Sequence, residues 1–274
     1  MIQTKKFKLT TLAFLFALML SGCTKSRNEL VADRFLTLQA ELDRIETSSQ
    51  QLSAQNDDIE ISLHHMVAEP DQLILDYTLT GSDEDILQSI ICNSFHSNKN
   101  VSYTSMSTIG YTTEKNLKNT SIHYIVVCKA DSTVLGKEDI GTNISLHFYS
   151  NTEQTSDLYI DCTIADIYEP KTTTMQQDIN YTDGTFTFLS VTRHSCYSEI
   201  TVTLDTPLNN FIFPQLYDSD GNSLGMLAAD GEDTSSFWFM PFPEDSDSIQ
   251  LEIAQAQKDG SYNALSDKTT ISLH

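Results

Sequence analysis

Four cysteines in the body of the chain have the clearest chemical options: Cys92, Cys128, Cys162 and Cys196. In an exported protein an even number of cysteines is typical of disulfides, and four cysteines allow three pairings. We favour a bridge between Cys92 and Cys128, because both fall in one predicted domain. Buried free thiols that pack like small apolar residues are the alternative. No Cys-x-x-Cys pair occurs, which argues against a zinc site or a thioredoxin-like redox centre.

Histidines give weaker signals for metal binding or acid–base chemistry. His64 and His65 are adjacent, and neighbours on a regular strand point to opposite faces, so we expect them not to share a metal. His194 and Cys196 lie two residues apart and would share a strand face, which is compatible with half of a zinc site or with a Cys–His dyad. No further ligand or orienting group is identifiable for this pair. A turn or strand edge is therefore the favoured interpretation.

Acidic residues form one incomplete metal-binding motif. Asp218, Asp220 and Asn222 match the first three ligands of an EF-hand loop. Ser223 stands where that loop needs glycine, and Ala229 where it needs glutamate, so a hairpin turn explains the residues better. Hydrolase, phosphate-loop and dinucleotide motifs are also missing from the sequence. We predict no catalytic residue, no metal and no cofactor, and we lean against an enzyme.

The densest aromatic segment of the chain lies near its end. Phe237 and Phe239 alternate with Trp238 along one predicted strand, so the two phenylalanines face one way and the tryptophan the other. We expect the phenylalanines in the core of a β-sandwich with Ile249, Leu251 and Ile253. Trp238 and Phe242 are then candidate contacts for a ligand or for the other domain.

The overall charge excludes one class of partner. The 274 residues include 38 acidic and 16 basic side chains, which gives a formal net charge of −22. Such a chain repels phosphate, so nucleic acid is not an expected partner. Apolar residues make up 39% of the chain, which is enough for a folded core. The length suits one large domain or two small ones.

The first residues carry an export signal. Lysines precede an apolar run, Leu9–Leu20, that is shorter than the ~20 residues needed to span a bilayer. The following Leu20-Ser21-Gly22-Cys23 resembles the lipobox of bacterial lipoprotein precursors. The resemblance implies that residues 1–22 are a signal peptide and that Cys23 carries the lipid. It places the mature chain outside the cytoplasm on the cell membrane. An ordinary secretory signal and an uncleaved anchor are the alternatives.

Residues 23–56 are predicted to form a lipid-anchored helical tether. A helix from Glu29 to Leu52 is indicated by alternating four- and three-residue steps, which are apolar except at Ser49: Val31, Phe35, Leu38, Leu42, Ile45, Ser49 and Leu52. This stripe could form a coiled-coil stalk, but Glu41 and Glu46 would then face each other in a parallel dimer. We favour a helix that lies against the first β-domain or acts as a loose spacer.

From Ile59 onward, period-two alternation predicts a mainly β chain. It begins with Ile59, Ile61, Leu63 and Val67. Pro70-Asp71 and Asp183-Gly184 are hairpin turn signals, and the break at 169–174 places a domain boundary. The halves 57–170 and 171–274 each fit an immunoglobulin-like β-sandwich. Further strands are expected at 86–95, 101–109, 121–129, 143–149, 158–167, 178–181, 185–191, 199–204, 211–217, 223–227, 237–240, 249–254 and 269–273.

The segments Ile59–Val67, Asp71–Tyr77 and Leu216–Asn222 resemble tandem immunoglobulin-like domains of unknown function outside the membrane in Gram-positive anti-sigma-factor-like surface proteins. Only eight residues precede the apolar run here, so no sigma-factor-binding segment is expected. The sequence favours a non-enzymatic binding or sensing module at the cell surface. Its partners would be the membrane, through the lipid, and an extracellular ligand or envelope protein. An envelope hydrolase with loop carboxylates and a structural spacer or accessory subunit are the alternatives.

Overall fold

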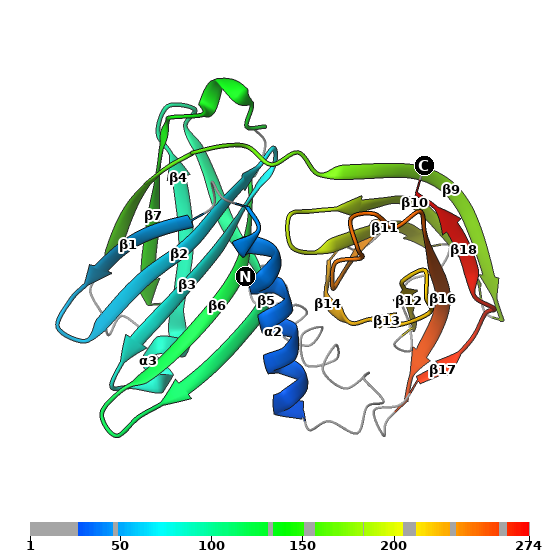
Figure 1. Cartoon of the computed structure of the whole chain (residues 1–274), viewed down its shortest axis with the longest axis horizontal. Coiled ribbons are helices and arrows are strands. Elements are labelled where there is room, and N and C mark those ends of the chain that lie inside the picture. The colour runs from blue at the N-terminus through cyan, green and yellow to red at the C-terminus, as the bar shows by residue number, and fades with distance from the viewer. Residues whose placement is uncertain are drawn as a thin grey trace, which may run out of the picture. The chain divides into compact units, whose positions relative to one another are not determined.

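Antiparallel strands make up most of the chain, as the alternation predicts (Figure 1). The computed structural model describes residues 27–45, 49–130, 134–150, 157–182, 184–204, 212–230, 234–257 and 262–273. The chain divides into two compact units, 31–169 and 170–274, and residues 27–30, the start of the first helix, are grouped with the latter. We call Val31–Glu169 the first unit and Pro170–His274 the second unit, and describe each on its own.

The first unit contains one sheet of eight strands. Its elements are α2 (Arg27–Asp43), β1 (Ser49–Gln55), β2 (Ile59–Glu69), β3 (Gln72–Gly81), α3 (Glu84–Ser89), β4 (Ile90–His96), β5 (Val101–Lys115), β6 (Thr120–Ala130), η2 (Lys137–Asp139), β7 (Asn143–Ser150) and β8 (Leu158–Thr163). The strand order is β1-β2-β3-β6-β5-β4-β7-β8. Pro70 and Asp71 join β2 to β3, which confirms the predicted hairpin.

This sheet curls on itself until its two ends meet. Cα atoms of β1 and β8, the first and last strands in the order, come within 8 Å of each other, so the sheet is a nearly closed barrel. The expected two-sheet sandwich over 57–170 is therefore wrong for this unit. Pairing-register shifts in β2 and β5 supply a physical reason, because bulges bend strands and increase their twist.

The predicted helix is shorter than its apolar stripe. It ends at Asp43, and residues 49–55 form β1, so the tether predicted over 23–56 and the helix to Leu52 are wrong in extent. Leu52 fits a helical step, but it also fits the alternation of a strand that packs on the barrel core. The Asn56 side chain accepts hydrogen bonds from the backbone N–H groups of Asp58 and Ile59, at 2.9 and 2.8 Å, and so turns the chain between β1 and β2.

Helix α2 lies on the outer face of the sheet. Phe35, Leu38 and Leu42 are at most 3% exposed. A Cβ built on Gly110 of β5 would lie 2.9 Å from a terminal methyl of Leu38, so the missing side chain lets helix and strand approach closely. Apolar residues of the helix that could have formed a coiled coil are thus already buried against the sheet. The prediction of a helix that lies against the first β-domain is confirmed.

The second unit is a β-sandwich. One sheet has the order β14-β15-β11-β10-β9, and the other β13-β12-β16-β17 with β18 also paired to β16. The strands are β9 (Lys171–Tyr181), β10 (Gly184–Arg193), β11 (Ser198–Leu204), β12 (Ile212–Tyr217), β13 (Ser223–Leu224), β14 (Met226–Asp230), β15 (Thr234–Phe239), β16 (Ser248–Ala256), β17 (Tyr262–Ala264) and β18 (Thr269–Ser272). Both sheets contribute to one core, which contains the predicted set Phe237, Phe239, Ile249, Leu251 and Ile253.

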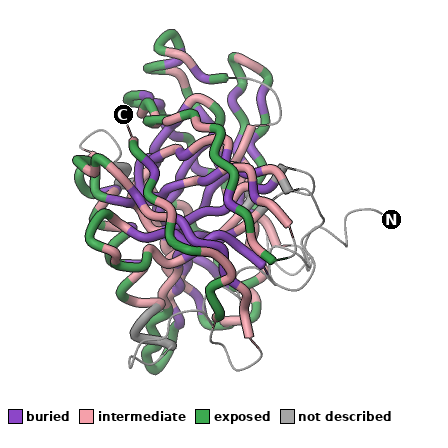
Figure 2. The backbone as a smooth tube through the Cα atoms, turned by 90° about the vertical axis from the view of Figure 1, so that its right-hand side faces the viewer, coloured by how far each residue is buried: buried purple, intermediate pink, exposed green. Residues whose placement is uncertain are grey.

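Burial differs among the strands: β3 is almost entirely buried, whereas most of β9 is exposed. Figure 2 shows buried stretches in the interior and exposed stretches mainly in the outer bends of the chain. Leu75, in the middle of β3, has no exposed surface, whereas Leu117, between β5 and β6, is fully exposed. The two leucines of one unit therefore occupy opposite extremes of burial.

This contrast gives a matched test of the barrel core. Leu75→Ala should lower the free energy of unfolding by about 2–5 kcal/mol, because it leaves a cavity among packed side chains. Leu117→Ala should change it by less than about 0.5 kcal/mol. Urea unfolding followed by far-ultraviolet circular dichroism measures both, and equal losses would contradict the described core.

Candidate functional site

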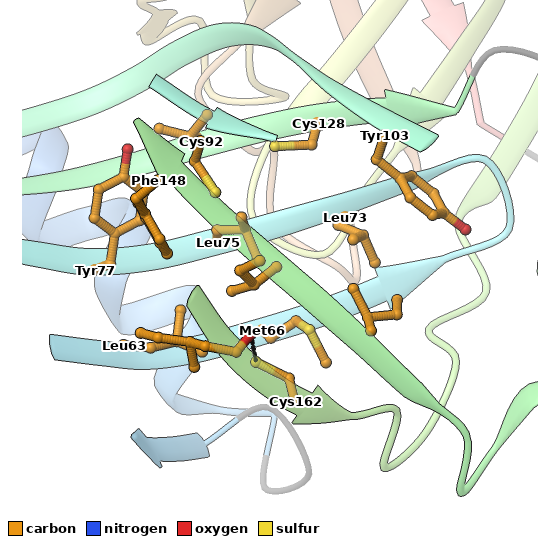
Figure 3. Close-up of a cluster of buried hydrophobic side chains, with 14 of the residues drawn as sticks. Leu63, Met66, Leu73, Leu75, Tyr77, Cys92, Tyr103, Cys128, Phe148 and Cys162 are labelled. Atoms are coloured by element: carbon orange, nitrogen blue, oxygen red, sulfur yellow. Dashed lines mark hydrogen bonds between the residues drawn. The ribbon is translucent and has the colours of Figure 1, made fainter. Parts of the chain in front are cut away.

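The predicted cysteines lie inside the first unit. Cys92 and Cys128 are buried and free, and both belong to the barrel core (Figure 3). Cys92 is on β4 and Cys128 on β6, with β5 between them. Two strand spacings separate such residues by roughly 10 Å, beyond the ~7 Å that a disulfide spans between Cα atoms. The structure thus does not form the expected bridge. Cys23 lies outside the described residues.

Burial also makes these thiols unreactive. It raises the pKa of Cys92 well above its usual range, and the pKa values of Cys128 and Cys162 to about 12. Such thiols stay protonated at neutral pH, and the thiol is a far weaker nucleophile than the thiolate. Cys196 of the second unit is likewise buried and forms no disulfide. The four cysteines therefore match the alternative of thiols that pack as small apolar residues.

Thiol labelling tests this arrangement. In the native protein, Cys92, Cys128, Cys162 and Cys196 should react slowly with Ellman's reagent, because all four are buried. All four should react at once in guanidinium chloride. A non-reducing peptide map that contained a Cys92–Cys128 crosslink would contradict the prediction.

The predicted aromatic contacts are enclosed rather than open. Trp238 is 1% exposed, and its ring lies 5.2 Å from the ring of Tyr197. Phe242 is 6% exposed and belongs to the core of the second unit. Its carbonyl oxygen accepts a hydrogen bond from Nε of Arg193 at 2.9 Å. Neither Trp238 nor Phe242 presents an open surface to a ligand.

Two other groups of candidate residues lie in turns, which is the interpretation that the sequence favours. His194 and Cys196 sit between β10 and β11, where His194 Nε2 lies 3.2 Å from a carboxylate oxygen of Glu199. The Asp218 carboxylate accepts hydrogen bonds from the backbone of Asp220 and from Asn222, in the turn between β12 and β13. Its oxygens are thus occupied within the turn. Among the described residues, no group of three or more His, Cys, Asp or Glu side chains is arranged to hold a metal ion.

A bulge in β2 creates a histidine cluster that the sequence did not reveal. Leu63 pairs with Tyr77 but His65 pairs with Asp76, so His64 is an extra residue in the ladder. The core then takes Leu63 and Met66, and both histidines between them lie on the outer face. The expectation that His64 and His65 point to opposite faces is therefore wrong.

The cluster is centred on one carboxylate with no exposed surface, that of Asp76 on β3. His65 Nδ1 lies 2.8 Å from one oxygen of Asp76, and His123 Nε2 of β6 bonds the other. The second ring nitrogen of His65 lies 3.2 Å from a carboxylate oxygen of Asp43, the last residue of α2. Phe35 of α2 meets the His123 ring edge-on at 4.6 Å. The cluster thus fastens the helix to the sheet.

Protonation in this cluster is set by burial and partners. Burial alone would raise the pKa of Asp76, but hydrogen bonds from His123 and His65 outweigh it and leave this pKa lowered. Burial lowers the pKa of His64, although the negative charge of Asp76 acts in the opposite direction and would raise it. His64 is therefore neutral at neutral pH, and its Nε2 lies 2.8 Å from the hydroxyl of Thr78. An ionised Asp76 is held by imidazoles beneath a helix, which suits a structural clamp.

The lowered pKa of His64 predicts a pH effect on stability. The unfolded chain binds more protons than the folded one between the folded pKa and ~6.5, so stability falls as pH drops below ~6.5. His64→Gln removes this group while keeping a polar partner for Thr78. Its melting temperature should fall less between pH 7.5 and pH 5 than that of the unmodified chain. Thermal melts at several pH values measure this, and identical pH slopes would exclude the assignment.

A stack of three rings covers the outer face of β7 and β8. His147 of β7 pairs across the strands with Tyr159 of β8, and their rings are nearly parallel with centroids 4.5 Å apart. Tyr149, two residues further along β7, also stacks on His147, with ring centroids 5.0 Å apart. An oxygen of Asp157 lies 2.9 Å from His147 Nε2, and the side-chain amide of Asn93 donates to the Tyr149 hydroxyl at 3.1 Å. Tyr159 is 58% exposed.

We call this set the ring stack: His147, Tyr149 and Tyr159. Sequence reasoning identified its strands but not the stack, although alternation in 147–149 and 157–161 places these residues outward. What was missing is the register that sets His147 opposite Tyr159. The ring stack is an accessible aromatic surface, unlike the enclosed Trp238.

Comparisons with known proteins bear on the fold. No protein-family model matches the chain. No curated protein matches it. Among solved structures, it is similar to one described as the conserved domain protein from Bacillus anthracis, with a TM-score of 0.55 and 10% identity, over 83% of this chain and 91% of that one. That likeness concerns the fold alone.

Two further matches contain immunoglobulin domains. The full ectodomain of mouse nectin-like molecule 4 matches with a TM-score of 0.24 and 12% identity, over 78% of this chain and 65% of that one. A three-domain titin structure matches with a TM-score of 0.20 and 8% identity, over 80% of this chain and 66% of that one. Across the described ranges, no helix has the length and apolar character needed to cross a membrane.

Proposed function

We propose that the chain is an extracytoplasmic lipoprotein that binds a partner at the cell surface without chemical conversion. The observation that carries the binding role is the ring stack, because Tyr159 keeps more than half of its surface open on a regular sheet face. Exposed aromatic side chains are favoured contacts in protein recognition. The buried thiols and the enclosed Asp76 lack the access that a catalytic group needs.

The lipobox supports the location. Cys23 would carry the lipid, and two acyl chains at ~0.8 kcal/mol per buried methylene suffice for stable anchoring. Helix α2 begins shortly after Cys23 and packs on the first unit. The anchor would therefore hold the first unit near the membrane surface. For the second unit, we propose an immunoglobulin-like arrangement of its two sheets.

Membrane fractionation tests the anchor. Cys23→Ala should leave the protein as an unprocessed precursor or release it from the membrane fraction, because the acceptor of the lipid is gone. Thr24→Ala, at the next position, is the matched control and should stay membrane-bound. Intact-mass measurement of the mature chain should show added acyl mass at Cys23. A mature N-terminus elsewhere without acyl mass would overturn the proposal.

A further inference from the structure

The ring stack ends in an open aromatic face. His147 covers one face of the Tyr159 ring at 4.5 Å, with an angle of 3° between the ring planes. Since Tyr159 is still 58% exposed, its opposite face is the accessible one. Beyond β8 the sheet continues across its seam to β1, where the side chains of Ser53 and Gln55 are exposed and polar. A planar group could therefore lie on Tyr159 and extend the stack.

Carboxylates stand on both sides of this face. The inward residues of β8, Ile160 and Cys162, belong to the barrel core, so Tyr159 and Asp161 point outward. Asp157 lies on the same side, because its carboxylate reaches His147, and its side chain is 51% exposed. Alternate residues of a strand are about 7 Å apart, so each carboxylate lies within reach of a group stacked on Tyr159.

The chemistry of this surface selects a planar cation. A guanidinium group is flat, stacks on aromatic faces and pairs with carboxylates through a fork of N–H donors. An ammonium group can also lie over an aromatic face, but it has neither a flat face to stack nor a planar fork of donors for the carboxylates. An anionic ligand would be repelled by Asp157 and Asp161, and by the formal net charge of −22.

From this geometry we propose that Tyr159, with Asp157 and Asp161, binds arginine side chains of a basic protein segment. The inference rests on the proposed binding function and names the chemistry of the partner. One arginine stacks on the open face of Tyr159 and donates hydrogen bonds to the flanking carboxylates. The ring stack fixes the orientation of Tyr159, so less side-chain freedom is lost on binding.

Fluorescence anisotropy with labelled peptides tests the proposal on the full-length chain in detergent. An arginine-rich peptide should bind more tightly than a lysine peptide of the same length and charge. Tyr159→Ala should weaken arginine-peptide binding about fivefold or more, through loss of the stacking face. Tyr159→Phe keeps the ring and should bind within about twofold of the unmodified chain. Circular dichroism of each variant checks that the fold is unchanged.

Paired charge variants separate a site from general attraction. Asp157→Asn with Asp161→Asn should weaken binding, whereas Glu60→Gln with Glu114→Gln removes the same charge at exposed positions on other strands and should not. Equal losses from the two pairs, equal binding of the two peptides, or an unchanged Tyr159→Ala variant would each overturn the proposal. If no peptide binds but the chain remains in the membrane fraction, an arginine-containing partner is excluded. The proposal of a lipid-anchored protein is then unaffected.

Discussion

Strand β3 is buried on both of its faces, and this constraint governs the first unit. Leu73 and Leu75 fill the barrel, while Ile74 and Asp76 are equally buried on the outer face. An outer face of this kind has to be covered, and an ionised carboxylate on it has to be neutralised, because an isolated buried charge costs several kcal/mol. The docking of α2 on β5 and His123 covers part of the outer face, and the bulge in β2 and the position of His123 bring imidazoles to the Asp76 carboxylate.

Local signals in the sequence located most elements. Alternation over 59–63 and 143–149 and turn chemistry at Pro70-Asp71 depend on neighbouring residues, so these strands and their hairpin were predictable. The number of sheets in each unit was not predictable in this way. A strand with one apolar face fits a two-sheet sandwich and a curled single sheet equally well, so the same pattern gave a sandwich in both halves. Only the second half forms one.

The site depends on pairing, which a single sequence does not record. One extra residue at His64 reverses the facing of every later residue of β2, so that Met66 and Ala68 enter the core and Val67 does not. Likewise, the stack of His147 on Tyr159 requires the register between β7 and β8. Trp238 shows the converse case. Its alternation correctly separated it from Phe237 and Phe239, but enclosure by other parts of the structure is not a local property.

The meeting of β1 with β8 also has a consequence for the order of assembly. β1 ends at Gln55 and β8 begins at Leu158, so this seam joins the most distant strands of the sheet. Hairpins such as β2–β3 close short loops, whereas the seam has to wait until the intervening strands are in place. During synthesis β1 emerges long before β8, and until the seam closes its outer edge is open to strands of other chains. We therefore expect closure of the barrel to come late in folding and to cover this open edge of β1.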